Sequence, residues 1–214
     1  MKKRLFWLAA WGISFGMIEA AVVIYIRQIL YAGGFQLLHI PMNDMVLRVE
    51  LIREVASLIL LWAAAELSAK TPQTKFYVFI ALFGLWDIFY YVFLKILINW
   101  PADLLVWDIL FLIPWIWTGP VLAPILVSLG MIAAGITGLY LSEKQIYLTL
   151  GAKFWAAEIA ACILILTSFL LPGKELMANV MPSAFPWFLF GVGLTGGFGF
   201  FLWILKSGKT TSHL

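Results

Sequence analysis

The chain has 214 residues, of which 64% are hydrophobic and 12% are charged, against about 45 to 50% and about 25% in soluble globular domains. This composition is typical of an integral membrane protein and argues against a soluble domain. The formal net charge of +3 comes from 14 basic and 11 acidic residues. These form no dense basic block, so a nucleic-acid partner is not expected. Long unbroken apolar runs favour helices over the alternating strands of a membrane barrel.

The sequence contains six apolar runs, each about as long as a helix that crosses a bilayer. The first run follows Met1-Lys2-Lys3-Arg4 and exceeds the roughly 7 to 15 residues of a signal-peptide core, so we interpret it as an uncleaved span. We predict an all-α, multi-pass integral membrane protein in which residues 1–214 form a single transmembrane domain. Its helical bundle has six spans: Leu5–Leu30, Met45–Ser68, Phe76–Ile98, Val121–Leu141, Ile146–Leu171 and Ala184–Leu205.

Residues 104–141 form an apolar stretch that is too long for one straight helix. At about 1.5 Å per residue this helix would be about 57 Å long, nearly twice the thickness of the hydrocarbon core. Prolines interrupt it, because each removes a hydrogen-bond donor and crowds the preceding turn; the interrupting residues are Pro114, Gly119, Pro120 and Pro124. We predict a Pro/Gly-interrupted region around 104–124, with a short helix over Leu104–Ile113 that lies at the interface or dips into the membrane and returns. If this helix crossed the membrane, the bundle would have seven spans.

The distribution of lysine and arginine predicts the orientation of the spans. In a six-span bundle the basic N-terminal residues, the loop from Lys70 to Lys75, Lys144 and the basic tail all fall on one side of the membrane. Cytoplasmic loops carry the excess of basic residues, so we expect that side to be cytoplasmic. The prediction is a protein of the cell membrane with both termini in the cytoplasm and the lipid bilayer as a partner.

The few cysteine and histidine residues limit the cofactors that the chain can hold. Cys162 is the single cysteine and lies in an apolar run, so we expect it to pack in the core rather than to form a disulfide, a zinc site or an iron–sulfur cluster. His39 lies in a connecting segment, and His213 is the last residue but one. A haem held by two histidines within the membrane is therefore not expected.

Ionisable side chains within the spans are the strongest functional signal. Each costs about 2.5 to 3.5 kcal/mol at mid-helix on insertion scales, and such groups usually face a cavity or a partner. Counted from the outer end of each span, Glu19, Glu54, Asp87 and Glu158 lie at similar depths of roughly 13 to 20 Å. Asp108 enters from the same side. We predict that these five carboxylates bind an ion or a proton in an outward-facing polar cavity.

The tripeptide Trp-Asp-Ile occurs twice, at residues 86–88 and 107–109, and its flanks do not extend into a longer repeat. In the predicted third span, Asp87, Tyr91 and Lys95 recur at i, i+4 and i+8, which puts them on one helix face. We predict Tyr91 and Lys95 as partners of the carboxylates. Asp108 would lie beside this span, but about seven residues, or roughly 10 Å, shallower than Asp87.

The predicted second span carries another polar face. Glu50, Glu54 and Ser57 recur at helical spacing, and Arg53 adjoins Glu54. Arg53 is therefore predicted as a second charge partner. Two polar faces on neighbouring spans indicate a cavity in which Arg53 and Lys95 neutralise part of the negative charge.

Three functions fit such a cavity, and we favour membrane transport. Carboxylates at mid-membrane depth suit the movement of a small cation, a proton or a proton-coupled solute. Alternatively, ion pairs such as Arg53 with Glu19 and Lys95 with Asp108 hold the helices in register. In that case the chain is a structural subunit of a membrane complex or a homo-oligomer.

The third function is a metal-dependent intramembrane enzyme acting on a lipid-linked or apolar substrate. Without histidine, a carboxylate site suits a hard divalent cation such as Mg²⁺, Ca²⁺ or Mn²⁺. Glu50 and Glu54 lie at i and i+4 with Arg53 between them, and Asp87 is expected at a similar depth. These three carboxylates are the candidate metal ligands.

Overall fold

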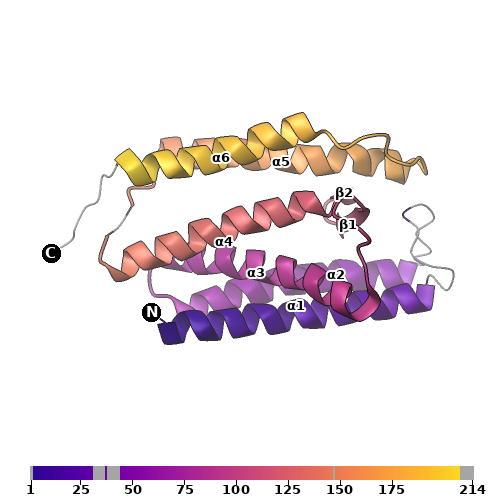
Figure 1. Ribbon diagram of the computed structural model, residues 1–214, viewed down its shortest axis with the longest axis horizontal. Coiled ribbons are helices and arrows are strands. Elements are labelled where there is room, and N and C mark those ends of the chain that lie inside the picture. Colours follow the sequence, from indigo (N-terminus) through magenta and orange to yellow (C-terminus); the bar gives the residue numbers. More distant parts are fainter. Residues whose placement is uncertain (1, 31–36, 38–43, 147, 208–214) are drawn as a thin grey trace.

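The computed structural model describes residues 2–30, 37, 44–146 and 148–207, which form six α-helices and one pair of β-strands (Figure 1). The helices are α1 (Lys2–Leu30), α2 (Asp44–Ser68), α3 (Pro72–Ile98), α4 (Leu122–Glu143), α5 (Ala152–Met177) and α6 (Trp187–Ser207). The strands are β1 (Trp107–Phe111) and β2 (Trp117–Pro120). Five of these helices, all but α2, are long and apolar enough to cross a membrane. The prediction of a helical membrane protein is confirmed to that extent.

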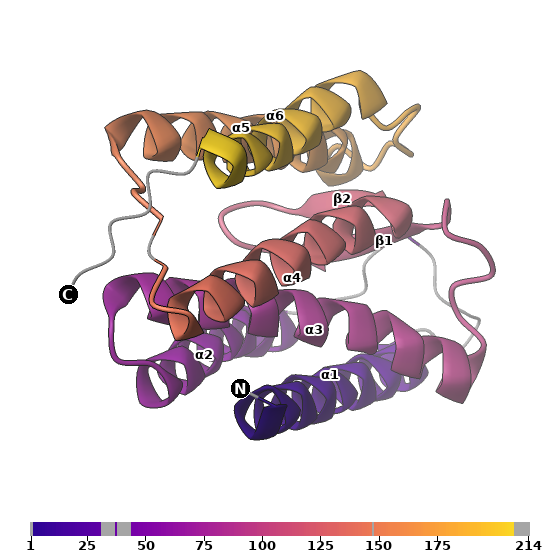
Figure 2. The same cartoon turned by 60° about the vertical axis from the view of Figure 1, so that its left-hand side comes forward.

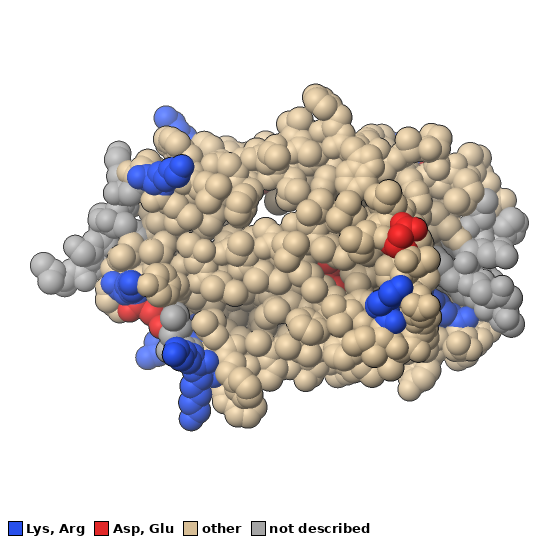
Figure 3. Space-filling view, in the orientation of Figure 1, with Lys and Arg blue, Asp and Glu red and all other residues tan. Residues whose placement is uncertain are grey.

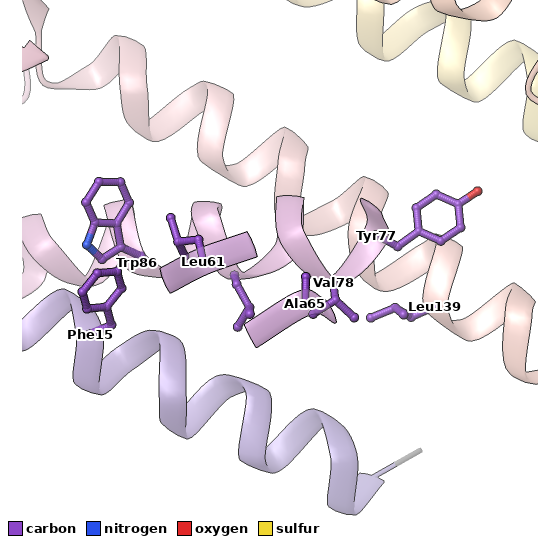
Figure 4. Close-up of a cluster of buried hydrophobic side chains, with 8 residues drawn as sticks. Phe15, Leu61, Ala65, Tyr77, Val78, Trp86 and Leu139 are labelled. Carbon is purple, nitrogen blue, oxygen red and sulfur yellow. The ribbon is translucent and has the colours of Figure 1, made fainter. Parts of the chain in front are cut away.

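Helix α3 is the centre of the first layer, because α1, α2 and α4 all pack against it (Figures 1 and 2). Side chains from these four helices form an apolar core along its length (Figure 4). The rings of Phe15 on α1 and Trp86 on α3 stack with their centroids 5.8 Å apart. The buried members of this core are Phe15, Leu61, Ala65, Tyr77, Val78, Leu82, Trp86 and Leu139.

Glycines allow α3 to approach its two main neighbours closely. A Cβ added at Gly16 of α1 would lie 2.9 Å from the backbone oxygen of Trp86, and one added at Gly84 of α3 would lie 2.5 Å from that of Ser128 on α4. Real Cβ atoms do not come that close to a backbone oxygen. The α1–α3 and α3–α4 interfaces therefore depend on the absence of a side chain at these positions.

Helices α5 and α6 form a second layer above the first (Figures 1 and 2). They pack along each other, and α5 also packs against β2. Two apolar clusters join this layer to α4, one near each end of that helix. The first cluster is built around Ala123, Phe169, Phe185 and Phe190. The second is built around Leu148, Phe154 and Phe201.

A β-hairpin replaces the short helix that we predicted over Leu104–Ile113. Strands β1 and β2 pair antiparallel, with Asp108 opposite Gly119 and Ile109 opposite Thr118. Aromatic and β-branched residues favour an extended chain here, and pairing satisfies backbone groups that have no partner in lipid. Residues 99–121 contain no helix, so the crossing helix that seven spans would require is absent.

Helix α5 begins at Ala152, six residues later than the predicted fifth span. Helix α4 ends at Glu143, and the chain turns at Gln145, which has a φ of 59°. The apolar residues before Gly151 had extended the predicted run, although Gly151 itself is the residue that precedes the helix. At its other end α5 contains Pro172 and continues to Met177.

The surface agrees with a position in a bilayer. In Figure 3 charged side chains gather mainly toward the two ends of the molecule, and the band between them is uncharged except for a small acidic patch near its centre. The beginning of α1 and the end of α6 lie at the same end (Figure 1). Large exposed apolar side chains along the helices, such as Ile52, Ile59 and Trp203, are those expected to face lipid.

Candidate functional site

A cavity of about 360 Å³ lies between the two layers. Residues of α1, α2, α3, the hairpin, α4 and α5 line it. The lining includes five carboxylates and two guanidinium groups, from Glu19, Arg27, Glu50, Arg53, Glu54, Asp87 and Asp108. Four of the five carboxylates predicted to bind an ion or proton therefore converge on one cavity.

Asp108 on β1 is held by Arg27 on α1. The Arg27 Nη2 donates to Asp108 Oδ1 at 3.2 Å, and the Arg27 guanidinium lies 3.8 Å from the ring centroid of Trp100. The side chains of Arg27 and Asp108 are 9% and 3% exposed. This buried ion pair ties the hairpin to the C-terminal end of α1. The predicted pair of Lys95 with Asp108 is therefore wrong.

The hydroxyls of α3 and β2 complete the surroundings of Asp108. The Tyr91 hydroxyl lies 3.3 Å from Asp108 Oδ2 and the Tyr90 hydroxyl 3.5 Å from it, while the Thr118 hydroxyl donates to the Asp108 backbone oxygen at 2.7 Å. Asp108 therefore has polar partners on α1, α3 and β2, and it lies where α1 and α3 meet the hairpin.

Arg53 on α2 joins two other carboxylates. Its guanidinium donates to Glu19 on α1 through Nη1, and to Glu50 Oε2 through Nε at 3.0 Å and Nη2 at 2.7 Å. The predicted pairing of Arg53 with Glu19 is confirmed. Since the backbones of α1 and α2 hardly approach each other, this ion-pair network is a principal link between the two helices.

Glu54 and Asp87 are different, because neither forms an ion pair within the described part of the chain, although Arg53 is near enough to act on Glu54 electrostatically. Both oxygens of Glu54 accept the backbone N–H of Leu112, at 2.8 and 3.1 Å. Asp87 Oδ2 accepts the Ser128 hydroxyl at 2.7 Å. Within the residues that the structure describes, no lysine or arginine nitrogen lies within 4.0 Å of either carboxylate. These two acids therefore face the cavity with neutral donors only.

Aromatic and aliphatic side chains make up the rest of the cavity wall. Phe83 and Trp86 come from α3, and Phe111 and Trp117 from the hairpin. Their rings form a continuous chain, with centroids 5.3 Å apart for Phe83 and Trp86 and 5.5 Å apart for Phe111 and Trp117. Helices α4 and α5 add further apolar surface, including Phe169. The cavity thus has an acidic part and an apolar part.

Two predicted site residues lie outside this cavity. Glu158 of α5 lies against α6, where a Cβ added at Gly197 would be 3.2 Å from Glu158 Oε2. Lys95 is exposed and donates to the backbone oxygen of Pro101 at 2.9 Å. Matched depth along the helix axis predicted Glu158, but depth does not determine which way a helix face points.

The predictions about cysteine, histidine and metal have different outcomes. Cys162 is exposed and borders the cavity, so the prediction that it packs in the core is wrong. His39 and His213 lie outside the described residues. Among the residues with described positions, no three His, Cys, Asp or Glu side chains are grouped so that they could hold a metal ion. Glu50, Glu54 and Asp87 line the cavity without forming such a group.

The structure adds three site groups that the sequence analysis missed. Arg27 follows Glu19 by eight residues, and that helical spacing indicates a shared face with Glu19. Ser128 is a buried hydroxyl within an apolar helix, which is a weak signal for a hydrogen-bond partner. The backbone N–H of Leu112 could not be predicted as a partner of Glu54, because its position depends on the hairpin.

Comparisons with known proteins give no further information about the site. No family model, no curated protein and no solved structure matches the chain. The site of this helical membrane protein is therefore interpreted from its own contacts.

Proposed function

We propose that all six helices cross the cell membrane, with both termini in the cytoplasm. Helix α2 has 25 residues, about 37 Å at helical rise, which is sufficient to cross. Its charged residues Glu50, Arg53 and Glu54 line the cavity, and this explains how an otherwise apolar helix can carry them. The end of the molecule at which α1 begins also holds Lys144 and Lys206, as expected for a cytoplasmic side.

We further propose that the protein transports a small cation, a proton or a proton-coupled solute through this cavity. The observation that carries the proposal is the pair of carboxylates, Glu54 and Asp87, that face one cavity with neutral donors only. A buried carboxylate without a cation either binds a proton or attracts a cationic ligand, since an isolated charge is costly in this environment. Both responses are what a coupled transport site requires.

The carboxylates of the cavity differ in their partners, and this difference supports the proposal. Glu19, Glu50 and Asp108 form ion pairs with Arg53 and Arg27, so they position helices and the hairpin. Glu54 and Asp87 remain for the transported ion or proton. Glu158 has no part in the proposed path, because it does not line the cavity.

Flux measurements in liposomes test the proposal. The protein is reconstituted with a pH-sensitive dye inside the vesicles, and inward gradients of Na⁺, K⁺ and small organic cations are applied in turn. We expect a cation-dependent or proton-dependent signal that Asp87→Asn reduces by at least about tenfold and Glu158→Gln leaves unchanged. Absence of any flux from correctly folded protein overturns the transport proposal.

One observation favours the metal-dependent enzyme as a second candidate. The aromatic rings of Phe83, Trp86, Phe111 and Trp117 and the volume of about 360 Å³ suit an apolar or lipid-linked substrate. Glu50, Glu54 and Asp87 are not grouped as a metal site among the described residues, so they would have to move together to bind a hard divalent cation. Elemental analysis of protein purified without chelator tests this candidate, since a metal content well below one ion per chain rejects it.

A further inference from the structure

Helix α5 forms one wall of the cavity without closing it. Its backbone comes close to α6 and β2, but to hardly any part of α1, α2, α3 or α4. Cys162 both borders the cavity and is exposed at the surface. Figure 3 shows a hollow between the layer of α5 and α6 and the layer below it. The cavity therefore opens sideways, along α5.

This lateral opening lies near the middle of the membrane. Cys162 is the eleventh residue of the 26-residue helix α5, about 15 Å from its beginning. The neighbouring side chains Ile159 and Ile163 are 56% and 57% exposed and apolar. A molecule that enters at this depth arrives through the hydrocarbon core, so it must carry enough apolar surface to partition there.

The interior of the cavity selects for positive charge. Its five carboxylates exceed its two guanidinium groups, which leaves three formal negative charges in excess. Asp87 and Glu54 are the lining acids that form no ion pair among the residues whose positions are described. An anionic or neutral ligand would leave this excess uncompensated, whereas a cation reduces it.

The aromatic wall indicates an organic cation in place of a bare metal ion. Trp86 adjoins Asp87 in sequence, and Phe83, Phe111 and Trp117 line the same space. Ammonium groups bind over the faces of such rings, most strongly over tryptophan. A volume of about 360 Å³ falls in the range of sites for small organic molecules, roughly 300 to 1,000 Å³.

We infer that the cavity binds an amphipathic organic cation, an amine or quaternary ammonium with an apolar group, that enters from the bilayer beside Cys162 and places its charge at Asp87. This inference rests on the proposed function, because it names the substrate class of the same site. The apolar group of the ligand would occupy the part of the cavity formed by Val127, Met131 and Leu166.

A binding experiment tests the ligand class. Hexyltrimethylammonium is titrated into the protein in nanodiscs by calorimetry, beside tetramethylammonium, which lacks the apolar chain, and hexanol, which lacks the charge. We expect hexyltrimethylammonium to bind at least about tenfold more tightly than either control compound. Asp87→Asn should weaken that binding at least about tenfold, and Glu158→Gln, which changes a carboxylate outside the cavity, should leave it unchanged.

A second pair of variants tests the entry route. Cys162→Trp places a large ring at the opening, whereas Ile163→Trp places the same ring on the adjacent lipid-facing position. We expect Cys162→Trp to slow association of hexyltrimethylammonium at least about tenfold and Ile163→Trp to have no effect. Equal association rates for the two variants overturn the lateral route.

Failure of this inference can be told apart from failure of the proposed function. Proton or Na⁺ flux that depends on Asp87, without specific hexyltrimethylammonium binding, overturns the inference and leaves transport standing. Binding that depends on Asp87, without flux of any cation in liposomes, upholds the binding site and counts against transport. Equal binding of hexyltrimethylammonium and hexanol also overturns the inference, because it shows that charge plays no part.

Discussion

The two copies of Trp-Asp-Ile place their aspartates in the same cavity, but in opposite chemical settings. Asp108, on the hairpin, has an ion pair with Arg27 and two tyrosine hydroxyls within 3.5 Å. Asp87, on the central helix α3, receives one hydroxyl from Ser128 and no cation among the described residues. The same tripeptide therefore supplies one carboxylate that joins the hairpin to α1 and one that faces the cavity without an ion pair in the described part of the chain.

This difference follows from the elements on which the two residues lie. The hairpin is short, and in addition to its apolar contacts a buried ion pair and hydrogen bonds attach it to α1 and α3. Helix α3 is already fixed by the packing of α1 and α4, and Asp87 adds one hydrogen bond to the α3–α4 interface. A carboxylate can remain without a cation only where other contacts maintain the fold.

The largest expected effect comes from Arg27→Met, which leaves Asp108 buried without its cation. Breaking a buried ion pair in this way costs about 3 to 5 kcal/mol of unfolding free energy. The defect should be larger at pH 8 than at pH 5, because protonation at low pH removes the charge of a buried carboxylate that has lost its cation. Chemical unfolding in detergent at both pH values provides the measurement.

Two further variants make this prediction specific. Adding Asp108→Asn to Arg27→Met should recover part of the lost stability, since no buried charge then remains. Arg48→Met changes an exposed arginine and should have little effect. If Arg27→Met and Arg48→Met were equally stable, the ion pair of Arg27 with Asp108 would not stabilise the fold.

The next effect in size is that of Gly84→Val on the α3–α4 interface, from which Ser128 reaches Asp87. A Cβ at Gly84 would lie 2.5 Å from the Ser128 backbone oxygen and 2.8 Å from Ile132 Cγ1. Overpacking of this kind costs about 1 to 3 kcal/mol. Gly130→Val on α4 is the matched control, because a Cβ there meets nothing within 4 Å. Thermal unfolding of both variants should show a lower melting temperature for Gly84→Val alone.

A smaller effect is expected for Thr118→Val, which removes the hydroxyl that donates to the Asp108 backbone oxygen. Loss of one buried hydrogen bond costs about 0.5 to 1.5 kcal/mol. Thr195→Val is the control, since the Thr195 hydroxyl is exposed and bonds to its own helix. An equal change in unfolding free energy for the two threonines would argue against the importance of this bond to the hairpin.

The smallest effect on stability should be that of Asp87→Asn, although this change is expected to reduce both transport and cation binding at least about tenfold. Asparagine keeps an acceptor for Ser128 and removes a buried charge, so we expect a loss of no more than about 0.5 kcal/mol. Unfolding of this variant beside Arg27→Met measures the contrast directly. If Asp87→Asn lost as much unfolding free energy as Arg27→Met, the conclusion that only Asp108 stabilises the fold would be wrong.

The helices and their polar faces could be predicted because both follow from local sequence. Apolar runs of bilayer length correspond to α1 to α6, and helical spacing correctly placed Glu50, Glu54 and Asp87 toward the interior. The ion pair of Arg53 with Glu19 followed from their similar depth. These predictions depend on periodicity and hydrophobicity, which are properties of single segments.

The hairpin could not be predicted in the same way, because its strands are stabilised by each other. A five-residue apolar strand and a short buried helix have similar composition, and only the pairing with β2 distinguishes them. The error in secondary structure then hid the Leu112 N–H as a partner of Glu54. Glu158 was misplaced for a related reason: its depth was known, but the packing of α5 against α6 was not.

The contact between Glu54 and Leu112 has a consequence for how the site responds to its ligand. A two-stranded ribbon ends in backbone donors that normally find water or another strand, and neither is available within lipid. Glu54 takes the place of that missing strand at the end of β1. Any proton or cation that binds Glu54 therefore competes with the Leu112 N–H of the hairpin. Occupancy of the site is then coupled to the conformation of the hairpin that connects α3 and α4.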